Sequence, residues 1–402
     1  MTWSRLDALR AALDTALAQS EREPGLIMAD DGSRAYAIMP ARVVNVVEPT
    51  LVSEAGHCST VVHSLCSAGK GLSFRVWAGA GAKLPTLERV GVDIRRYFFR
   101  RLRKIQAFLL YRRLLREPGQ IVVSTAGRFD LTVLDWIASG PIPESKEFLY
   151  FHRLRLTPAK ETALRRLAAR QPHVVMLGTT DTIERKLREL GFAHTATMLP
   201  LPVPAGSATK QAQPFRHVLV AGASRRDKGF RQIVDFVEHL AQSGASLPVT
   251  IQVSGDHYNR YDEHTLQDLK RLRALKYGHL TLLPETLRSD EYTALFQGAI
   301  CLQPYDRHEY ADKISGITLD AFTSGAPVIA VSDTWMARMV ERFGAGVTVT
   351  DTTPRLLEQA VLDVIAAYDR YHERARAAGV ALREQQTWKP VVEAISRSVD
   401  GK

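Results

Sequence analysis

Short apolar runs alternate with helical stretches along most of this 402-residue chain, and this alternation restricts its fold more than any other feature. In the first half, the runs "ARVVNVVEPTL", "LSFRVWAG", "QIVVSTA", "KEFLYFHRL" and "HVVMLGTT" have the length and apolar content of buried strands. Helical sequence such as "GHCSTVVHSLCSAG" and "TDTIERKLRELGF" stands between or after them. Strand and helix in this order predict a parallel sheet with helices on its faces.

The alternation stops once and then restarts. Residues 199–215, "LPLPVPAGSATKQAQPF", are rich in Pro, Ala and Gly and lack periodicity, which is typical of a linker. The sequence therefore predicts two doubly wound, Rossmann-like parallel-sheet domains, residues 1–203 with an extra N-terminal helix and residues 204–380. A C-terminal helix within residues 381–402 can pack back on the first domain. The two domains would face a central cleft at the carboxyl ends of both sheets, where ligands of such sheets bind.

Basic residues are concentrated in one part of the first half. The chain carries 53 Lys and Arg against 43 Asp and Glu, a net charge of +10, and nine of the basic residues lie between Arg95 and Arg116. Apolar residues recur near helical spacing in the same segment, at Ile94, Phe98, Leu102, Ile105, Phe108, Leu109 and Leu115. Residues 94–116 therefore predict a basic amphipathic helix in peripheral contact with the inner face of a membrane. The alternative is an ordinary surface helix whose apolar face meets the core.

Other classes of protein lose support from the sequence. No recognised nucleic-acid module is visible, and the basic residues are not interleaved along a stacking surface. No apolar run approaches the roughly 18 residues that span a bilayer, and the start of the chain lacks the apolar centre of a secretion signal, so we expect a cytoplasmic protein. The three cysteines form neither a disulfide framework nor a zinc pattern.

A first candidate site lies in "HEYADKISGITLDAFTSGAPVIAVSD", residues 308–333. Ser315 and Gly316 stand where a helix begins, and a helix start offers unpaired backbone amides and the positive end of the helix dipole to an anion. Asp312 precedes this point and Asp320 follows it by about one turn, so both can face one ligand. The alternative is that Ser315 only caps the helix and both Asp side chains are solvated.

A second candidate site lies in "VAGASRRDKGF", where a strand ends at Gly222 and a helix begins near Gly229. Arg225 and Lys228 would lie in the loop at the carboxyl end of the sheet, where two cations suit a diphosphate. Taken singly, they are better explained as a solvated basic turn. Together with the helix start in the same half of the chain, they favour the binding of a diphosphate.

These residues resemble a known family. "GASRRDKG", followed about 80 residues later by "QPYDRHEYADKISGITLDAFTSGAPVIA", is similar to the donor-binding half of the GT-B glycosyltransferases, in particular glycosyltransferase family 4. The resemblance covers residues 217 to about 365, and the first half of the chain matches only in pattern. It implies that residues 1–203 bind the acceptor and residues 204–380 bind the nucleotide sugar. It implies a retaining glycosyl transfer from a nucleotide diphosphate sugar, which is the donor substrate.

The resemblance also implies roles for single residues. Asp312 would contact hydroxyls of the donor sugar and Asp320 the ribose, and both are Asp where the family usually has Glu. The remaining donor-binding positions are the backbone around Gly222, Ser315, Gly316 and Ile317.

Arg225 and Lys228 match the cations that neutralise the departing diphosphate. His152 matches a histidine near the donor sugar, with a purely structural histidine as the equal alternative, and Gly56 would let a phosphate approach the backbone. The chain contains no Asp-x-Asp, the motif by which the other large glycosyltransferase class holds its metal, so we expect no metal and no further cofactor.

The sequence thus predicts a glycosyltransferase that moves a sugar to a glycan or a lipid-linked acceptor, as in the assembly of bacterial surface polysaccharides. Two alternatives remain. One is a non-catalytic GT-B homologue that binds a nucleotide or a glycan. The other is an epimerase that acts on the nucleotide sugar itself.

Overall fold

The structure is a computed structural model that describes residues 43–54, 57–69, 71–154, 156–198, 213–255, 261–284, 287–385 and 388–400. The predicted N-terminal helix, the boundary at residue 203 and most of the predicted linker lie outside the described residues.

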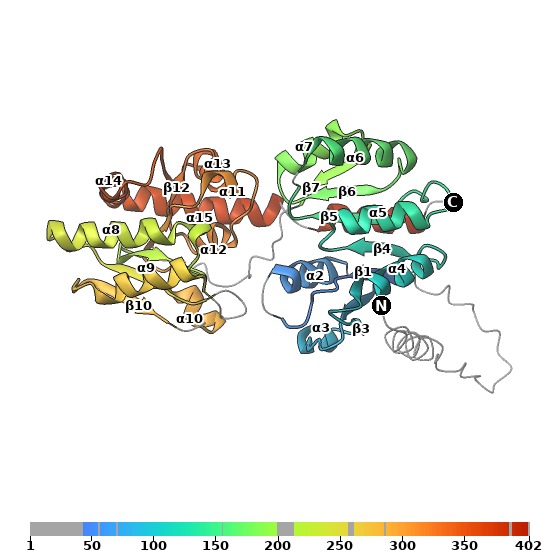
Figure 1. Ribbon diagram of the computed structural model, residues 1–402, viewed down its shortest axis with the longest axis horizontal. Coiled ribbons are helices and arrows are strands. Elements are labelled where there is room, and N and C mark those ends of the chain that lie inside the picture. The colour runs from blue at the N-terminus through green and yellow to red at the C-terminus, as the bar shows by residue number, and fades with distance from the viewer. Residues whose placement is uncertain are drawn as a thin grey trace. The chain divides into compact units, whose positions relative to one another are not determined.

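The first sheet has seven parallel strands in the order β3-β2-β1-β4-β5-β6-β7 (Figure 1). Its strands are β1 (Val43–Val47), β2 (Ser73–Gly79), β3 (Asp93–Phe98), β4 (Gln120–Val123), β5 (Glu147–Phe151), β6 (Val175–Gly178) and β7 (His194–Thr197). The central strands form from short, buried, mostly apolar runs, as expected of a parallel sheet covered on both faces. The strand order reverses between β1 and β4, which makes this pair the topological switch point of the sheet.

Helices cover both faces of the first sheet. They are α2 (His57–Ala68), α3 (Pro85–Arg89), α4 (Arg103–Leu114), α5 (Arg128–Ile137), α6 (Pro158–Arg170) and α7 (Asp181–Glu189). Buried residues of α4, α5, α6 and α7 share one core with the sheet, and those of α2 and α3 share the core on the other face. Figure 1 shows α5 and α6 side by side over one face. Side-chain caps begin two of these helices, because Thr157 accepts from the Lys160 amide and Thr180 from the Ile183 amide.

The end of the chain completes the core of the first sheet. Trp388 is 1% exposed, and its ring lies 5.3 Å from that of Tyr150 on β5. Val391 and Ile395 of α16 (Lys389–Asp400) are buried in the same cluster as Val44 of β1. The last described helix therefore packs against strands formed some 300 residues earlier.

The second sheet has six parallel strands in the order β10-β9-β8-β11-β12-β13. Its strands are β8 (His217–Val220), β9 (Val249–Gln252), β10 (Leu280–Leu283), β11 (Ala299–Gln303), β12 (Val328–Val331) and β13 (Gly346–Val349). The helices are η1 (Arg226–Lys228), α8 (Phe230–Ser243), α9 (Glu263–Ala274), α10 (Ser289–Ala294), α11 (Arg307–Tyr310), α12 (Gly316–Thr323), α13 (Trp335–Phe343), α14 (Pro354–Ala366) and α15 (Tyr368–Gln385). The prediction of two parallel sheets with interleaved helices is confirmed.

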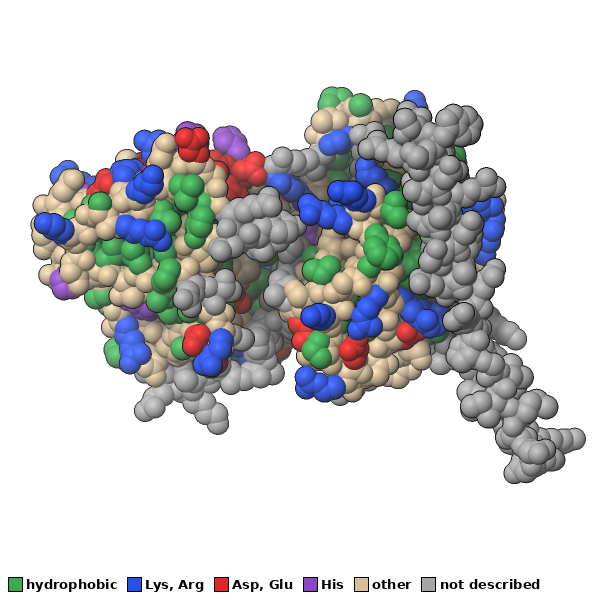
Figure 2. Space-filling view, turned by 60° about the horizontal axis from the view of Figure 1, so that its bottom comes forward, with side chains coloured by type: hydrophobic (Ala, Val, Ile, Leu, Met, Phe, Trp, Pro, Cys, Tyr) green, Lys and Arg blue, Asp and Glu red, His purple; other side chains and the backbone are tan. Residues whose placement is uncertain are grey.

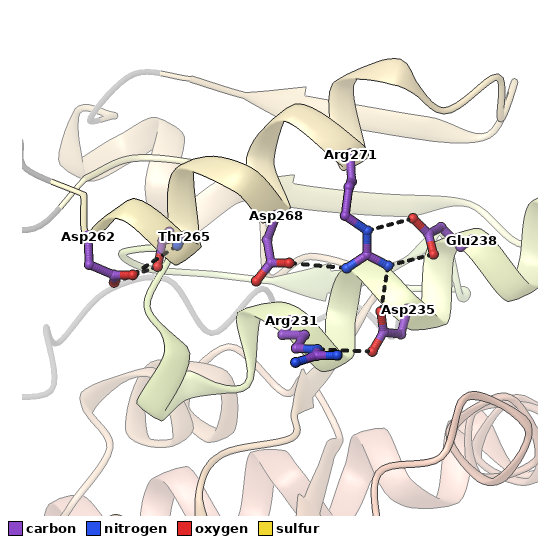
Figure 3. Close-up of polar contacts among 7 residues, drawn as sticks. All are labelled: Arg231, Asp235, Glu238, Asp262, Thr265, Asp268 and Arg271. Carbon is purple, nitrogen blue, oxygen red and sulfur yellow. Dashed lines mark hydrogen bonds and ion pairs between the residues drawn. The ribbon is translucent and has the colours of Figure 1, made fainter.

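The helices of the second sheet also form two layers. Buried residues of α8, α9 and α14 share one core with the sheet, and those of α12, α13 and α15 share another. On the first face, Arg271 of α9 donates to Asp235 at 2.8 Å and to Glu238 at 2.7 Å, both on α8, and also pairs with Asp268 of its own helix (Figure 3). Asp235 and Glu238 thus join α8 to α9, and all three carboxylates raise the pKa of Arg271 above its usual value.

The prediction of one basic amphipathic helix over residues 94–116 is wrong in its first part. Residues Asp93–Phe98 are the edge strand β3, which pairs with β2 and is fixed there by an ion pair of 2.7 Å between Arg75 and Asp93. Only Arg103–Leu114 are helical. The face that α4 buries also differs from the predicted one, because Ile105 is 42% exposed. The buried residues of α4 are Gln106, Ala107, Leu110, Tyr111 and Leu114.

A polar residue is buried on α4 because the end of β3 needs hydrogen bonds. The Gln106 side-chain amide donates to the Tyr97 carbonyl at 2.6 Å, and its oxygen accepts from the Phe99 amide at 2.8 Å. These contacts satisfy the backbone where the edge strand ends. No helix among the described residues is both long enough and apolar enough to cross a membrane.

Candidate functional site

The loop after β8 turns on Gly222. Its φ is +86°, in the left-handed region that favours glycine, and its amide donates to the Gln252 side chain at 2.8 Å. A Cβ atom at this position would lie 2.9 Å from Nζ of Lys228 and 3.1 Å from Cδ1 of Ile317. The space beside this one backbone position is therefore bordered by both the predicted cation and the first turn of α12.

Lys228 is held in place by the turn that follows it. Gly229 has a φ of +72°, and a Cβ atom there would lie 2.0 Å from the Pro304 carbonyl oxygen, so the chain passes too close to β11 for any side chain. The Lys228 ammonium lies 5.8 Å from the centre of the Tyr305 ring. Desolvation lowers the pKa of Lys228 to about 8, and the charge of Arg225 acts in the same direction. Lys228 is thus a desolvated cation that an incoming anion would stabilise.

Arg225 belongs to a short charge network that sequence analysis did not identify. Its Nε lies 2.8 Å from Oδ1 of Asp227, and Lys313 Nζ lies 3.3 Å from the other oxygen of the same carboxylate. Burial acts to raise the pKa of Asp227, but Arg225 and Lys313 hold it below its usual value. Because Lys313 precedes α12, this network ties the loop after β8 to the start of that helix. The adjacency of opposite charges in "RRDKG" was the only sequence signal for it.

The start of α12 matches the predicted helix start. Ser315 is buried, and its hydroxyl oxygen accepts from the Thr318 amide at 3.4 Å. Thr318 in turn donates to the Gln303 side chain at 2.7 Å, which anchors the first turn on β11. A Cβ atom at Gly316 would have nothing within 4 Å, so the first residue of the helix faces open space. Ser315 does cap the helix, and the capped end remains accessible to an anion.

The two predicted carboxylates have different partners. Asp312 accepts from Lys186 of α7 at 2.7 Å and lies 3.8 Å from Arg338. Asp320 accepts from the Tyr292 hydroxyl at 2.9 Å. Burial raises the pKa of Asp320 to about 6, and the hydrogen bond from Tyr292 limits the rise. The spacing in the sequence suggested that both carboxylates could face one ligand. In the structure, each carboxylate is hydrogen-bonded to a different side chain, Asp312 to Lys186 and Asp320 to Tyr292.

The predicted residues of the first half are placed as follows. His152 follows β5, and its Nε2 lies 2.9 Å from the Ser124 carbonyl oxygen at the end of β4. Since a carbonyl oxygen only accepts, Nε2 carries the hydrogen, and the ring is also packed 4.6 Å from that of Tyr150. His152 is therefore rigidly oriented at the carboxyl edge of the first sheet. Gly56 lies outside the described residues.

No protein-family model and no curated protein matches this sequence, but solved structures match the fold. HepE from Anabaena, in complex with UDP and glucose, has a TM-score of 0.62 at 15% identity, over 90% of this chain and 100% of that chain. The chain has the GT-B fold. Sucrose-phosphate synthase from Thermosynechococcus elongatus has a TM-score of 0.61 at 13% identity, over 89% of this GT-B chain and 98% of its own. A trehalose-6-phosphate synthase, studied for glycosyl transfer with retention, has a TM-score of 0.57 at 11% identity, over 89% of this chain and 99% of that chain.

Proposed function

We propose that this GT-B chain is a glycosyltransferase that takes its sugar from a nucleotide diphosphate sugar. The observation that carries the proposal is the position of Lys228 Nζ and of Ile317, on the first turn of α12, against one backbone glycine, Gly222. In glycosyl transfer the bond to the anomeric carbon breaks and negative charge develops on the leaving diphosphate. Cations and helix-start amides aimed at that charge lower the barrier.

The charge of the diphosphate would be met by the chain itself. Lys228 and Arg225 supply two positive charges, and α12 supplies backbone amides at Ser315 and Gly316. Because Arg225 is already paired with Asp227, we infer that a diphosphate shares this arginine with the carboxylate. We propose on this basis that transfer needs no metal ion. We expect full transferase activity after exhaustive chelation of metal ions. Loss of activity on chelation that is reversed only by added metal would contradict the proposal.

The remaining roles are proposed by residue. Asp320 would bind the ribose, Asp312 the hydroxyls of the donor sugar, and His152 would lie near the same sugar. Asp312 is held by Lys186 at 2.7 Å, so a sugar hydroxyl must compete with this lysine for the carboxylate. Retention of the anomeric configuration is supported by the likeness to the trehalose-6-phosphate synthase. The stereochemistry of the purified product would test it.

The first experiment is titration with nucleoside diphosphates. HepE was solved with UDP, so UDP is tested first, followed by GDP and dTDP. We expect Lys228→Ala and Arg225→Ala each to weaken binding of the diphosphate at least tenfold, and Lys270→Ala, an exposed lysine on α9, to leave it unchanged. Wild-type affinity in both site variants would refute the assignment. Turnover of a panel of nucleotide sugars then decides between the activities: binding without turnover indicates a non-catalytic homologue, and an altered donor released without acceptor indicates an epimerase.

We further propose a peripheral membrane contact for the surface around α4, with the protein on the cytoplasmic side and a glycan or lipid-linked acceptor. Phe99 is 57% exposed and Trp136 of α5 75% exposed, and the Trp136 ring lies 5.4 Å from that of Phe108 on α4. Exposed aromatic side chains beside Arg and Lys are suited to an anionic headgroup region.

Figure 2 shows Lys and Arg side chains at many separate places on one face of the molecule, so net charge alone does not define the membrane surface. Exposed aromatic rings provide a sharper test. Trp136→Ala should reduce co-sedimentation with anionic vesicles at low salt, and unchanged co-sedimentation would contradict the proposed contact.

A further inference from the structure

The proposed donor site uses residues of the second sheet together with His152 of the first, and it gives no role to the switch point of the first sheet. The order of the first sheet reverses between β1 and β4. In open parallel sheets, ligands bind in the crevice outside the carboxyl ends of the strands at this point. A cavity of about 230 Å³ lies there, walled by the segments that follow β1 and β4 and by the first turn of α4. Its polar lining residues are Glu48, Thr50, Arg103, Lys104, Thr125 and Asp130.

The wall formed by α4 is cationic. Arg103 and Lys104 are the first two residues of that helix, and both side chains are exposed. The Lys104 ammonium lies 5.9 Å from the centre of the Phe129 ring, which lines the same cavity. Within the described part of the chain, neither cation is ion-paired with a carboxylate. Two cations at the rim of one cavity suit a phosphate group.

The part of the lining that follows β1 and β4 is built around a buried carboxylate. Glu48 is 0% exposed and accepts from the Ser124 hydroxyl at 2.8 Å, from the Thr50 hydroxyl at 2.5 Å, and from the Thr125 hydroxyl. Because both threonine hydroxyls give their hydrogen to Glu48, their oxygens are left as acceptors. Cys58 Sγ lies 3.7 Å from the Thr50 oxygen and 3.8 Å from the Thr125 oxygen, and a hydroxyl oxygen has a second lone pair for a ligand. Such a wall selects ligands that carry hydroxyl donors. The Asp130 carboxylate, which also lines the cavity, accepts from the Tyr111 hydroxyl at 2.7 Å and from the Gly127 amide at 2.8 Å, and these bonds fix its position.

We propose that this cavity binds the acceptor, and that the acceptor carries a phosphate group next to its hydroxyls. The inference rests on the proposed glycosyl transfer and names the chemistry of its second substrate. The phosphate lies against Arg103 and Lys104, and the hydroxyls against Thr50 and Thr125. The cavity is smaller than the roughly 300–1,000 Å³ typical of drug-sized ligands, so it accommodates one sugar-sized group.

A phosphate beside hydroxyls can belong to a soluble sugar phosphate or to the headgroup of a lipid. A groove of about 590 Å³ between α5 and α6 also includes Gly127 in its lining. Its wall carries the leucines Leu131, Leu154, Leu156, Leu164 and Leu167. This groove could receive the hydrocarbon of a lipid-borne acceptor. The experiment therefore has a soluble arm and a lipid arm.

The soluble arm measures binding of hexose 1-phosphates and hexose 6-phosphates to the full chain by calorimetry, with and without saturating UDP. The parent hexoses and inorganic phosphate are the ligand controls. The pocket variant is R103A/K104A, and its matched control is R112A/R116A, which removes two exposed cations outside the cavity lining. We expect a hexose phosphate to bind more tightly than either control ligand, and its affinity to fall at least tenfold in the pocket variant alone.

The lipid arm measures co-sedimentation with phosphatidylcholine vesicles, with and without phosphatidylinositol. Non-specific attraction would weaken equally in both double variants, because each removes two positive charges. A loss of phosphatidylinositol-dependent binding confined to R103A/K104A identifies a lipid-borne phosphate. A difference between the variants in the soluble arm only identifies a soluble acceptor.

The acceptor proposal and the donor proposal can fail separately. If the two double variants behave alike in both arms while UDP binds them and the wild type equally, the acceptor pocket is wrong and the donor site stands. If a hexose phosphate binds through Arg103 and Lys104 while no nucleoside diphosphate binds the wild type, the pocket stands and the proposed transfer loses its donor. Because both cations are exposed on a helix start, their removal should leave folding intact.

Discussion

Nucleotide binding should depend on pH through Lys228. This lysine lies beside Gly222 with a pKa of about 8, because the folded chain keeps water from its ammonium group. A diphosphate binds the protonated form, and its phosphates are already ionised above their second pKa of about 6. As pH rises, the free protein must therefore take up a proton before or during binding. The neighbouring Arg225 stays charged throughout this range.

The size of the effect follows from the pKa. About 90% of Lys228 is protonated at pH 7 and about 10% at pH 9, so the affinity for UDP should fall about tenfold between these values. A tenfold loss corresponds to about 1.4 kcal/mol of binding free energy. A further pH unit should cost about another tenfold, until Arg225 and the start of α12 alone hold the diphosphate.

Isothermal titration calorimetry across pH 7 to 9 measures this directly. Repeating each titration in buffers of different ionisation enthalpy reports the proton uptake, which should be greatest near and above pH 8. Lys228→Met removes the titrating group, and we expect it to bind UDP weakly with an affinity that no longer changes with pH. Constant wild-type affinity over this range, or an equal fall in the variant, would refute the role of Lys228.

Three further predictions concern single positions. Gly222→Ala should abolish tight UDP binding because its Cβ enters the space beside Lys228. Gly244→Ala is the control and should leave UDP binding unchanged, because Gly244 has a similar φ of +71° but a Cβ atom there would have nothing within 4 Å. Both should lose about 1–2 kcal/mol of stability from left-handed backbone, so equal nucleotide affinity in the two variants would contradict the site. Glu147 is fully buried, neither of its oxygens has a hydrogen-bond partner among the described residues, and burial raises its pKa to about 8. Because this pKa exceeds the unfolded value, the folded chain holds the proton more tightly. The free energy of unfolding is therefore highest below about pH 4.5 and falls as the pH rises to about 8. Glu147→Gln should therefore gain about 1.4 kcal/mol per pH unit relative to the wild type between pH 5 and 8 in urea unfolding, and parallel pH profiles would argue against it. Arg271→Ala should cost about 1 kcal/mol at low salt and less at high salt, since its ion pairs are partly exposed; a salt-independent loss would show that packing, not charge, joins α8 to α9.

The fold was predictable because its central strands are short apolar runs between helical stretches, a pattern that indicates buried strands of a parallel sheet. The strand β3 was not, because it is an edge strand whose Arg95 and Arg96 face solvent, and its few apolar residues also fit helical spacing. Its identity comes from pairing with β2, a contact that no local pattern encodes.

The candidate site divides in the same way. Glycine and lysine in "GASRRDKG" indicated the turn at Gly222 and the cation at Lys228, because both depend on residues close in sequence. The partners of Asp312 and Asp320 could not be predicted. Asp312 meets Lys186, which is 126 residues away, and Asp320 meets Tyr292 on another helix. Spacing along one helix says nothing of such distant partners.

The position of α16 in the sequence determines when the core of the first sheet can be completed during synthesis. The strands of the first sheet leave the ribosome long before Trp388, Val391 and Ile395, which fill one face of their core. That face stays uncovered until residues 388–395 have been made, so nascent chains stalled before residue 388 should recruit chaperones or aggregate.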